Sequence, residues 1–374
     1  MTEPEPLQQV SRTYVRYRQR KLSYFSGCDY FRLASHPRVM AALQTGLKRY
    51  GLNVAASRLT TGNHVLYREL EAHLADFFAA ESALLVPSGY VTNLIAAQAL
   101  AGHFSHALID ASAHSSLADA ARLLDCPVLQ FESQDAKALA ATVKRCGPGS
   151  KLLLLTDGMF ASDGSAAPLA EYLKVLPEDA LILVDDAHGA GVLGRNGQGA
   201  PEHAGVSRRR IIQTITLSKS CGAYGGAILG TARLRQQILD RSRMFVGGTP
   251  LPLPLANAAL AGVRILKADK SLRPRLFRNA TYVKTALREA GLALAETPGP
   301  IVPLHPCRPR EAARLHRALL TADIYPPLIK YPGGPPAGYF RFVISSEHTP
   351  SQLDALLNVL CRYVKRQPVS GRAA

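Results

Sequence analysis

From Ser82 onward, the chain alternates short apolar runs with amphipathic stretches of helical periodicity. The apolar runs are bounded by turn-forming residues, and the first amphipathic helices are expected from about Val91 and around residues 117–124. Strands that alternate with helices favour a mostly parallel sheet covered on both faces, so we expect an α/β fold. The expected strands are residues 83–86, 107–109, 127–131, 151–156, 180–184 and 211–216.

The chain on either side of this alternation has a different pattern. Residues 1–20 are polar and carry several arginines, and we expect a helix there that docks late or frays. Two further helices are expected at residues 38–50 and 66–77, and Asn63 is the expected N-cap of the second. In the C-terminal part, we expect helices at residues 255–268 and 272–290 and from Pro309, with apolar runs at 301–305 and 339–345.

These patterns predict one large domain and one small domain. The large α/β domain is expected over residues 61–269, and the small α+β domain over residues 270–374. Residues 1–60 are expected to pack with the small domain.

Composition narrows the class of protein. No apolar run is long enough to span a membrane, and the start MTEPEPLQQV lacks the pattern of a signal peptide, so we expect a cytoplasmic protein. The six cysteines show no Cys-x-x-Cys spacing and are expected to be reduced thiols, with no metal site.

The net charge of +16 has three interpretations. The basic residues form a generic solvated surface, they attract a phosphate-bearing acyl carrier, or they bind nucleic acid. Nucleic acid is the least favoured, because the basic residues are spread along the chain without a recognisable nucleic-acid motif.

Two strand ends carry candidate chemistry. The run Leu181–Val184 ends in Asp185, Asp186 and, two residues later, His188. Ligands of open α/β sheets bind beyond the carboxyl ends of strands, where an Asp can keep a pyridinium nitrogen protonated. The alternative is an Asp that caps the next turn beside a surface histidine.

The second strand end presents a lysine in a loop rich in hydroxyls and glycine. The strand 211–216 ends at Thr216, and Ser218 and Lys219 follow at once, before Gly222 and Gly225. A lysine desolvated in such a loop forms a Schiff base readily. The alternative is a solvated loop lysine, and this pattern is weak alone.

A third turn comes earlier in the chain. Ser88, Gly89 and Tyr90 follow an apolar run and begin a helix. Backbone N–H groups and the positive end of the helix dipole suit a phosphate, although a simple helix cap has the same pattern. The order is informative, because a phosphate turn, an acid and a Thr-x-x-Lys each stand at a strand end.

With these motifs, the chain resembles the α-oxoamine synthases among the fold-type I enzymes that use pyridoxal 5′-phosphate (PLP). The resemblance runs from about Tyr30 to Leu360. It implies a fold-type I architecture, PLP as the cofactor, and a homodimer with its active site at the subunit interface. The motifs that carry it are Ser57–Gly62, Ser88–Tyr90, His114, Thr156–Phe160 with Asp163–Gly164, Asp185–Gly194, Thr216–Lys219 and Glu347–Pro350.

The resemblance implies a role for each matching residue. Lys219 would hold PLP as a Schiff base and move protons, and Asp185 would pair with the ring nitrogen. His188 would bind the phenolic oxygen, and His114 would stack on the ring. The phosphate would be held by Ser88, Gly89, Tyr90 and Thr216, with Thr249 contributed by a partner subunit.

Substrate binding is implied for a separate set of residues. Arg341 would bind the substrate carboxylate, although a structural ion pair is the alternative. Some members of the family have a second carboxylate-binding arginine, which this chain lacks, and Lys330 and Tyr331 lie near its place. The chain departs from the family pattern at Ala113, at Ala161 and at Asn53–Ala56, and we expect these changes to reshape the acyl path.

The expected reaction joins an amino acid to an acyl thioester, carried by coenzyme A or a carrier protein, and gives an α-amino ketone and CO2. The best expectation is an activity like that of 8-amino-7-oxononanoate synthase. A serine palmitoyltransferase-like activity, another PLP-dependent reaction such as transamination, and an inactive accessory subunit remain alternatives.

Overall fold

The computed structural model describes residues 5–330 and 337–365, which form two compact units. The larger unit comprises residues 37–160 and 165–269, and the smaller comprises residues 1–36, 161–164 and 270–374 as far as these are described. The division predicted from the sequence, 1–60, 61–269 and 270–374, stays a prediction about folding domains. Helix α1 (Pro37–Tyr50) nevertheless packs within the larger unit, against α10 (Leu253–Ala268).

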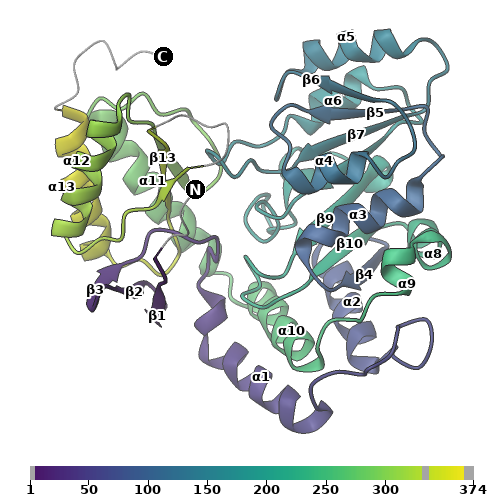
Figure 1. The fold of residues 1–374 in the computed structure, drawn as a ribbon, viewed down its shortest axis with the longest axis horizontal. Helices are drawn as coiled ribbons and strands as arrows, with labels where there is room; N and C mark the ends of the chain where they lie inside the picture. The colour runs from purple at the N-terminus through teal and green to yellow at the C-terminus, as the bar shows by residue number, and fades with distance from the viewer. Residues whose placement is uncertain (1–4, 331–336, 366–374) are drawn as a thin grey trace. The chain divides into compact units, whose positions relative to one another are not determined.

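A seven-stranded sheet organises the larger unit (Figure 1). Its strand order is β4-β10-β9-β8-β7-β5-β6, and β10 runs antiparallel to both neighbours while the remaining pairs are parallel. The expected mostly parallel sheet is therefore confirmed. The strands are β4 (Ser82–Val86), β5 (His106–Asp110), β6 (Val128–Phe131), β7 (Leu152–Asp157), β8 (Leu181–Asp185), β9 (Ile211–Thr216) and β10 (Gly226–Gly230).

Helices pack on this sheet through an apolar core. Helix α3 contacts β9 and β10, and α4 contacts β5 and β7. Alternate residues of β7, Leu153 and Leu155, enter the same core cluster, as the period of two along a strand requires. Besides α1 and α10, the helices are α2 (Val65–Phe77), α3 (Gly89–Leu100), α4 (Ser115–Ala121), α5 (Ala136–Cys146), α6 (Leu169–Val175), α7 (Ala200–His203), α8 (Ala232–Arg241) and α9 (Arg243–Val246), with the 3₁₀ turn η2 (Arg208–Arg210).

The start of α2 differs from the prediction. His64, not Asn63, caps the helix, since its ring nitrogen accepts the N–H of Leu66. The side-chain oxygen of Asn63 instead accepts two N–H groups of Arg58 at 3.2 and 2.9 Å. Because Arg58 is buried, its guanidinium needs hydrogen-bond acceptors, and the side-chain oxygen of Asn63 accepts from it rather than capping the helix.

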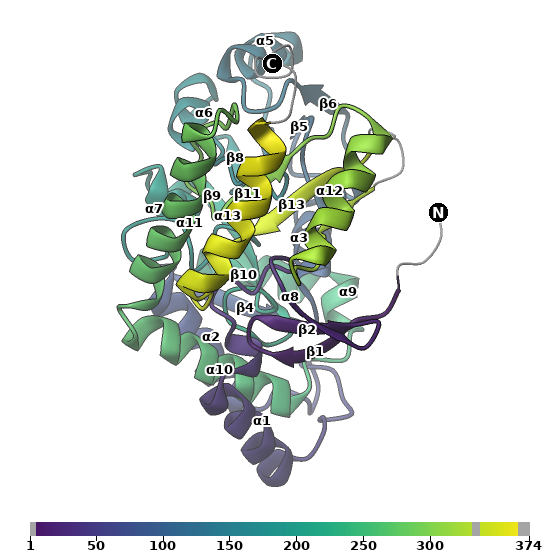
Figure 2. The same ribbon diagram turned by 90° about the vertical axis from the view of Figure 1, so that its left-hand side faces the viewer.

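The smaller unit contains two three-stranded sheets and three helices within its described residues (Figure 2). One sheet has the order β1-β2-β3 and the other β11-β13-β12, both antiparallel. Their elements are β1 (Gln8–Ser11), β2 (Tyr14–Tyr17), β3 (Arg20–Ser23), η1 (Leu33–Ser35), α11 (Leu272–Glu289), β11 (Ile301–Leu304), α12 (Pro309–Thr321), β12 (Leu328–Ile329), β13 (Tyr339–Val343) and α13 (Pro350–Lys365).

The helix predicted for residues 1–20 is wrong, because strands β1 and β2 and the start of β3 occupy this segment. Tyr17 pairs with Arg20 across a two-residue turn in which Arg18 and Gln19 both have positive φ, 46° and 62°. Such a turn matches the twist of a hairpin, and burial of Val15 and Leu22 anchors it. Most residues of this segment are polar, so its sequence shows no clear alternation of apolar and polar residues that would predict strands.

Candidate active site

The carboxyl ends of the strands in the larger unit border a cavity of about 240 Å³, here called the carboxyl-edge cavity. Strands β7, β8 and β9 end there, and β4 joins them because it is two antiparallel steps from β9. Eight of the predicted catalytic or cofactor-binding residues line it. The lining is Ser88, Gly89, Tyr90, His114, Ser116, Asp157, Asp185, Ala187, His188, Thr216, Ser218 and Lys219.

Asp185 is buried and held by three donors. Its Oδ2 accepts from Asn93 Nδ2 at 2.6 Å and from Ser116 Oγ at 3.2 Å, and its Oδ1 accepts the N–H of Ala187 at 3.1 Å. Donors that converge on a carboxylate fix its orientation. This arrangement suits an acid that must keep a ring nitrogen protonated.

A second acid stands beside it. Asp157 ends β7 in register with Asp185 at the end of β8, and its Oδ2 accepts the N–H of His114 at 2.8 Å. Burial, reinforced by the charge of Asp185, raises the pKa of Asp157 well above its ordinary value and favours the protonated form. Sequence reasoning did not assign this residue to the site, although its place at the end of an adjacent strand was a usable signal.

Lys219 lies in the loop that follows β9. Its Nζ is 2.8 Å from Nε2 of His188, so the amine and the imidazole share a hydrogen bond. Both side chains reach the cavity from neighbouring strand ends. An amine paired with a titratable partner is equipped to accept and return a proton.

The turn at the start of α3 forms a cradle for an anion. Ser88 is the N-cap of α3, and its side chain makes no capping hydrogen bond. A Cβ on Gly89 would lie 2.6 Å from Cβ of Thr216, so the backbone here approaches β9 more closely than any other residue would allow. The free first-turn N–H groups, the hydroxyl of Thr216 and the helix dipole together suit a phosphate.

These features fit PLP in its three parts: a lysine for the aldehyde, an acid for the ring nitrogen and an N–H cradle for the phosphate. The model for aminotransferases of class I and II matches residues 28–360. The chain belongs to this family.

Similar proteins place the chain more closely. It is 35% identical over 357 residues to a putative 8-amino-7-oxononanoate synthase of Desulforudis audaxviator, covering 95% of this chain and 92% of that protein. It is 36% identical over 349 residues to the 8-amino-7-oxononanoate synthase of Thioalkalivibrio sulfidiphilus, covering 92% and 89%. The serine palmitoyltransferase of Sphingomonas wittichii superposes with a TM-score of 0.89 at 26% identity, covering 97% and 92%.

The chain is thus a member of the α-oxoamine synthases, which are PLP-dependent acyltransferases. The predicted family, fold type, enzyme class and cofactor are confirmed. The role of each site residue stays a prediction, because the likeness concerns the whole chain.

In this α-oxoamine synthase, His114 is oriented by its own helix. Its Nδ1 accepts the N–H of Ser116 at 3.3 Å and caps α4, and the Ser116 hydroxyl lies 2.8 Å from the same nitrogen. The ring meets Tyr90 edge-on, with centroids 6.0 Å apart. The cap fixes the ring at the cavity, as a stacking role would require.

The other predicted residues are Thr249 in the larger unit and Arg341, Lys330 and Tyr331 in the smaller unit. Thr249 is exposed on the loop between α9 and α10. Arg341, on β13 of the smaller unit, donates from Nη1 to the carbonyl of Ala161 at 3.2 Å, so the departure at Ala161 lies against this arginine. Lys330 is exposed after β12, and Tyr331 lies outside the described residues.

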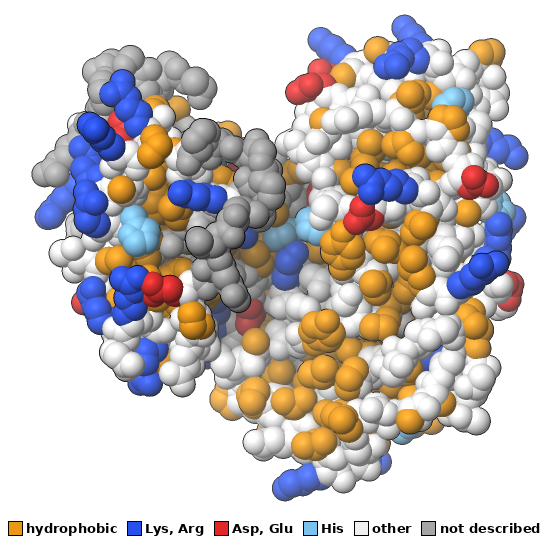
Figure 3. Space-filling model, viewed as in Figure 1, with side chains coloured by type: hydrophobic (Ala, Val, Ile, Leu, Met, Phe, Trp, Pro, Cys, Tyr) orange, Lys and Arg blue, Asp and Glu red, His pale blue; other side chains and the backbone are white. Residues whose placement is uncertain are grey.

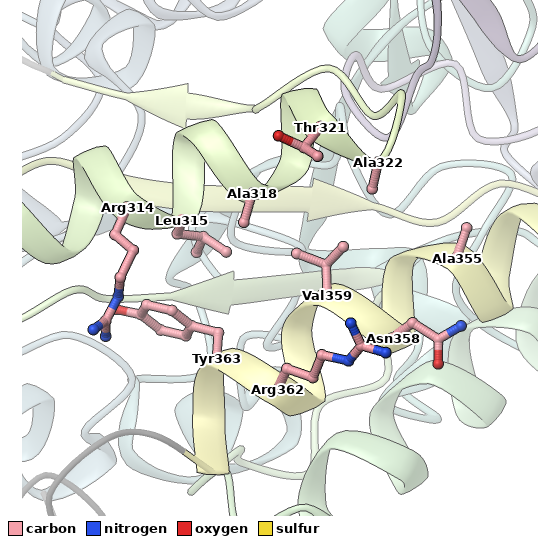
Figure 4. Close-up of a pocket in the computed structure, with 10 residues that line it drawn as sticks. All are labelled: Arg314, Leu315, Ala318, Thr321, Ala322, Ala355, Asn358, Val359, Arg362 and Tyr363. Atoms are coloured by element: carbon pink, nitrogen blue, oxygen red, sulfur yellow. The ribbon is translucent and has the colours of Figure 1, made fainter.

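The smaller unit has a larger groove of about 560 Å³ between α12 and α13 (Figure 4). None of the predicted residues that the structure describes lines it. Its floor is apolar, and the guanidinium of Arg314 lies over the ring of Tyr363 at 5.8 Å. Size alone therefore does not mark the site of chemistry, because the groove lacks the acids and the amine that the smaller cavity holds.

Proposed function

We propose that this enzyme condenses an amino acid with an acyl thioester, as an 8-amino-7-oxononanoate synthase does. The α-carbon loses a proton and forms a bond to the thioester carbonyl carbon. The thiol leaves with a proton, the carboxylate leaves as CO2, and the α-carbon is protonated again. The convergence of Lys219, His188 and Asp185 on one cavity carries this proposal, together with relatives of that name that are matched over more than 90% of the chain.

When bound, PLP supplies an electron sink for the charge that develops at the α-carbon. Asp185 would keep the proton on the ring nitrogen, and its three donors prevent that carboxylate from turning away. Lys219 Nζ would take the α-proton, with His188 Nε2 as its hydrogen-bond partner. His114 would cover the ring face from the cap of α4.

The substrate carboxylate is proposed to bind Arg341, aided by Lys330 and Tyr331. Arg341 is half-buried, and one of its terminal nitrogens is held by the Ala161 carbonyl. A guanidinium that is fixed in this way loses less conformational freedom on binding a carboxylate. As the two substrates we propose alanine and a pimeloyl thioester, which the resemblance to the 8-amino-7-oxononanoate synthases implies.

A homodimer is part of the proposal, with Thr249 acting in the partner's cavity. Hydrophobic side chains gather on the face of the larger unit in Figure 3. Exposed Leu52 and Leu59 lie on the loop between α1 and α2, and exposed Val246 is the last residue of α9. A hydrogen bond from Ser57 to the Val246 carbonyl joins the two segments. Apolar patches of this kind mark interfaces, and Thr249 lies on the loop that follows α9.

Two further parts concern the surroundings of the enzyme. A cytoplasmic location is supported by six cysteines that are all free thiols. An acyl carrier protein is the proposed alternative to coenzyme A as the carrier of the acyl group, since the net charge of +16 would attract its phosphate-bearing arm. Within the described residues, no helix is long and apolar enough to cross a membrane.

A serine palmitoyltransferase-like activity is the second candidate. Structures of serine palmitoyltransferase superpose with TM-scores near 0.90 and cover 97% of the chain, whereas an 8-amino-7-oxononanoate synthase of Francisella tularensis gives 0.79 and 92%. The similarity of the backbone thus favours the serine palmitoyltransferase-like activity, and sequence identity favours the 8-amino-7-oxononanoate synthase-like activity. An inactive accessory subunit is a weaker alternative, because the cavity retains Lys219. Transamination is a further alternative, and it differs from the proposed reaction in releasing no thiol.

The test is thiol release by the PLP-loaded enzyme, with alanine, serine or glycine against pimeloyl- or palmitoyl-coenzyme A. We expect release only with alanine and the pimeloyl thioester, and a product of the mass of the α-amino ketone. Lys219→Ala should lose the yellow colour of lysine-bound PLP and lower the rate on the order of 10³-fold or more. Lys137→Ala, at an exposed lysine of α5, is the control and should keep both.

Other outcomes would reassign the function. Release with serine and palmitoyl-coenzyme A would select the second candidate. Amino transfer without thiol release would make the protein an aminotransferase, and failure to take up PLP would make it an accessory subunit.

A further inference from the structure

The opposite end of the same sheet carries a second cavity of the larger unit, here called the amino-edge cleft. Its volume is about 510 Å³, and it opens where β8 and β9 begin and where β10 passes into α8. None of the residues that line the carboxyl-edge cavity reaches it. Its lining is Leu100, His103, Phe104, Lys151, Asp179, Leu181, Arg209, Arg210, Ile211, Ile212, Thr231, Arg233, Leu234 and Gln237.

The charges of this cleft are one-sided. Four cationic side chains line it against a single carboxylate, Asp179. Arg210 is used structurally, since it donates to the carbonyls of Ala180 and Pro177. Within the described part of the chain, Lys151, Arg209 and Arg233 have no carboxylate within ion-pair distance, and all three are exposed.

His103 lies close to several of the cations at this cleft. His103 lies on the cleft and shares a hydrogen bond with Arg241 just outside it. Burial first, and then the charges of Arg241, Arg233 and Lys151, lower the pKa of His103. Cations that outnumber the acids around them repel one another and destabilise a fold, so an arrangement of this kind suits a place where an anion supplies the missing negative charge.

Two further features give the site its shape. The first turn of α8 opens on the cleft, with Thr231 as N-cap and Arg233 in the same turn, so that the helix dipole adds to the positive potential. Leu100, Phe104 and Leu234 form an apolar wall. The volume falls within the range of about 300–1,000 Å³ usual for small-molecule sites.

We propose that the amino-edge cleft binds a small diphosphate-bearing ligand whose organic part rests on the apolar wall. Arg209, Arg233 and Lys151 neutralise the phosphates, and Phe104 contacts the body of the ligand. The site is separate from the carboxyl-edge cavity, and its existence does not depend on which acyl thioester the enzyme uses.

The test uses the PLP-loaded enzyme, so that the phosphate cradle of the carboxyl-edge cavity is filled. ADP and inorganic pyrophosphate are titrated separately by calorimetry at low and at physiological salt. We expect one saturable site for ADP and weaker binding of pyrophosphate, which lacks the organic part. The double variant Arg209→Ala/Arg233→Ala should weaken ADP at least about tenfold, because each removes a charge-assisted contact.

The matched control removes two positive charges elsewhere on the larger unit, with Arg68→Ala/Lys137→Ala on exposed residues of α2 and α5. It should leave ADP binding within about twofold, and its catalytic rate should equal that of the wild type. Equal weakening in both double variants would show a generic charge effect and overturn the site. Absence of saturable binding of either probe at low salt would overturn it as well.

A stability measurement separates binding from structure. If the cations are kept for a ligand, Arg209→Ala/Arg233→Ala should melt no lower than the wild type without ADP, since like-charge repulsion is relieved. A melting temperature several degrees lower would show that the arginines hold the fold, and the loss of binding would then be secondary. Phe104→Ala should weaken ADP and leave pyrophosphate unchanged.

Discussion

At its carboxyl edge, the seven-stranded sheet holds a cavity with buried, hydrogen-bonded acids, whereas at its amino edge it holds a cleft in which the cations outnumber the acids and most of them are exposed. Asp185 accepts three hydrogen bonds and Lys219 shares one with His188. Arg209 and Arg233, by contrast, extend from the amino edge into solvent.

The difference between the two edges shows that residues for proton transfer and residues for anion binding have different surroundings in the same fold. Groups that move protons must hold fixed positions and altered pKa values, so their neighbours are specified and buried. Groups that attract an anion keep their charge at any physiological pH and need only converge. Buried acids with hydrogen-bond partners therefore mark the reacting site, and unbalanced exposed charge marks a binding site.

The largest effect is expected at Asp185. The Asp185→Asn variant keeps the size of the side chain but cannot hold the ring nitrogen protonated, so turnover should fall on the order of 10²–10³-fold. Steady-state thiol release measures it, with Asp240→Asn on the exposed face of α8 as the control. A loss of less than about threefold would mean that the buried partnered acid has no catalytic part, and the comparison between the two edges would fail.

A smaller effect is expected at the phosphate cradle. In Gly89→Ala, the new methyl group would stand 2.6 Å from Cβ of Thr216, so α3 must shift away from β9. Overpacking of this kind costs about 1–3 kcal/mol, which predicts roughly five- to 150-fold weaker PLP binding. Fluorescence titration with PLP measures the change.

The matched control for the cradle is Gly147→Ala. A Cβ at Gly147 meets nothing within 4 Å, although its φ of +81° disfavours alanine. That variant should lose some stability and keep its affinity for PLP. Equal losses of affinity in the two variants would attribute the effect to general destabilisation.

The sequence predicted the sheet because its buried strands are continuous runs of apolar residues. The run at residues 211–216 became β9 with the same bounds, and 127–131 became β6 less one residue. The chain order of cradle, acid and lysine was informative for the same reason, because parallel strands bring their carboxyl ends to one edge. Eight predicted residues therefore share one cavity.

What the sequence did not show depends on pairings between distant residues. The hairpin of β2 and β3 relies on two positive φ values that no propensity marks at Arg18 and Gln19. The partners of Asp185 come from Asn93 and Ser116, which are 92 and 69 residues away along the chain. The amino-edge cleft was invisible for the same reason, since its cations Lys151, Arg209 and Arg233 lie far apart in the sequence and only the fold brings them to one edge of the sheet.

The smallest effect concerns Asp186, which lies behind the carboxyl-edge cavity. Its Oδ2 accepts from the N–H of Ala200 at 2.9 Å and from Gln213 Nε2 at 2.5 Å, while its Oδ1 has no hydrogen-bond partner among the described residues. Complete burial raises its pKa from 3.8 to about 7. The folded state therefore holds the proton more tightly than the unfolded state does.

The sign of the pH effect follows from this shift. The stabilisation by protonated Asp186 is fully present below about pH 4 and is lost as the pH rises through about 7. The loss is at most about 1.4 kcal/mol per pH unit. Asp186→Asn cannot titrate, so its melting temperature should fall less between pH 5 and about pH 8 than that of the wild type, as calorimetry would show. Parallel pH profiles would mean that Asp186 is ionised throughout, and the buried acids would then resemble the exposed charges of the amino edge in their protonation.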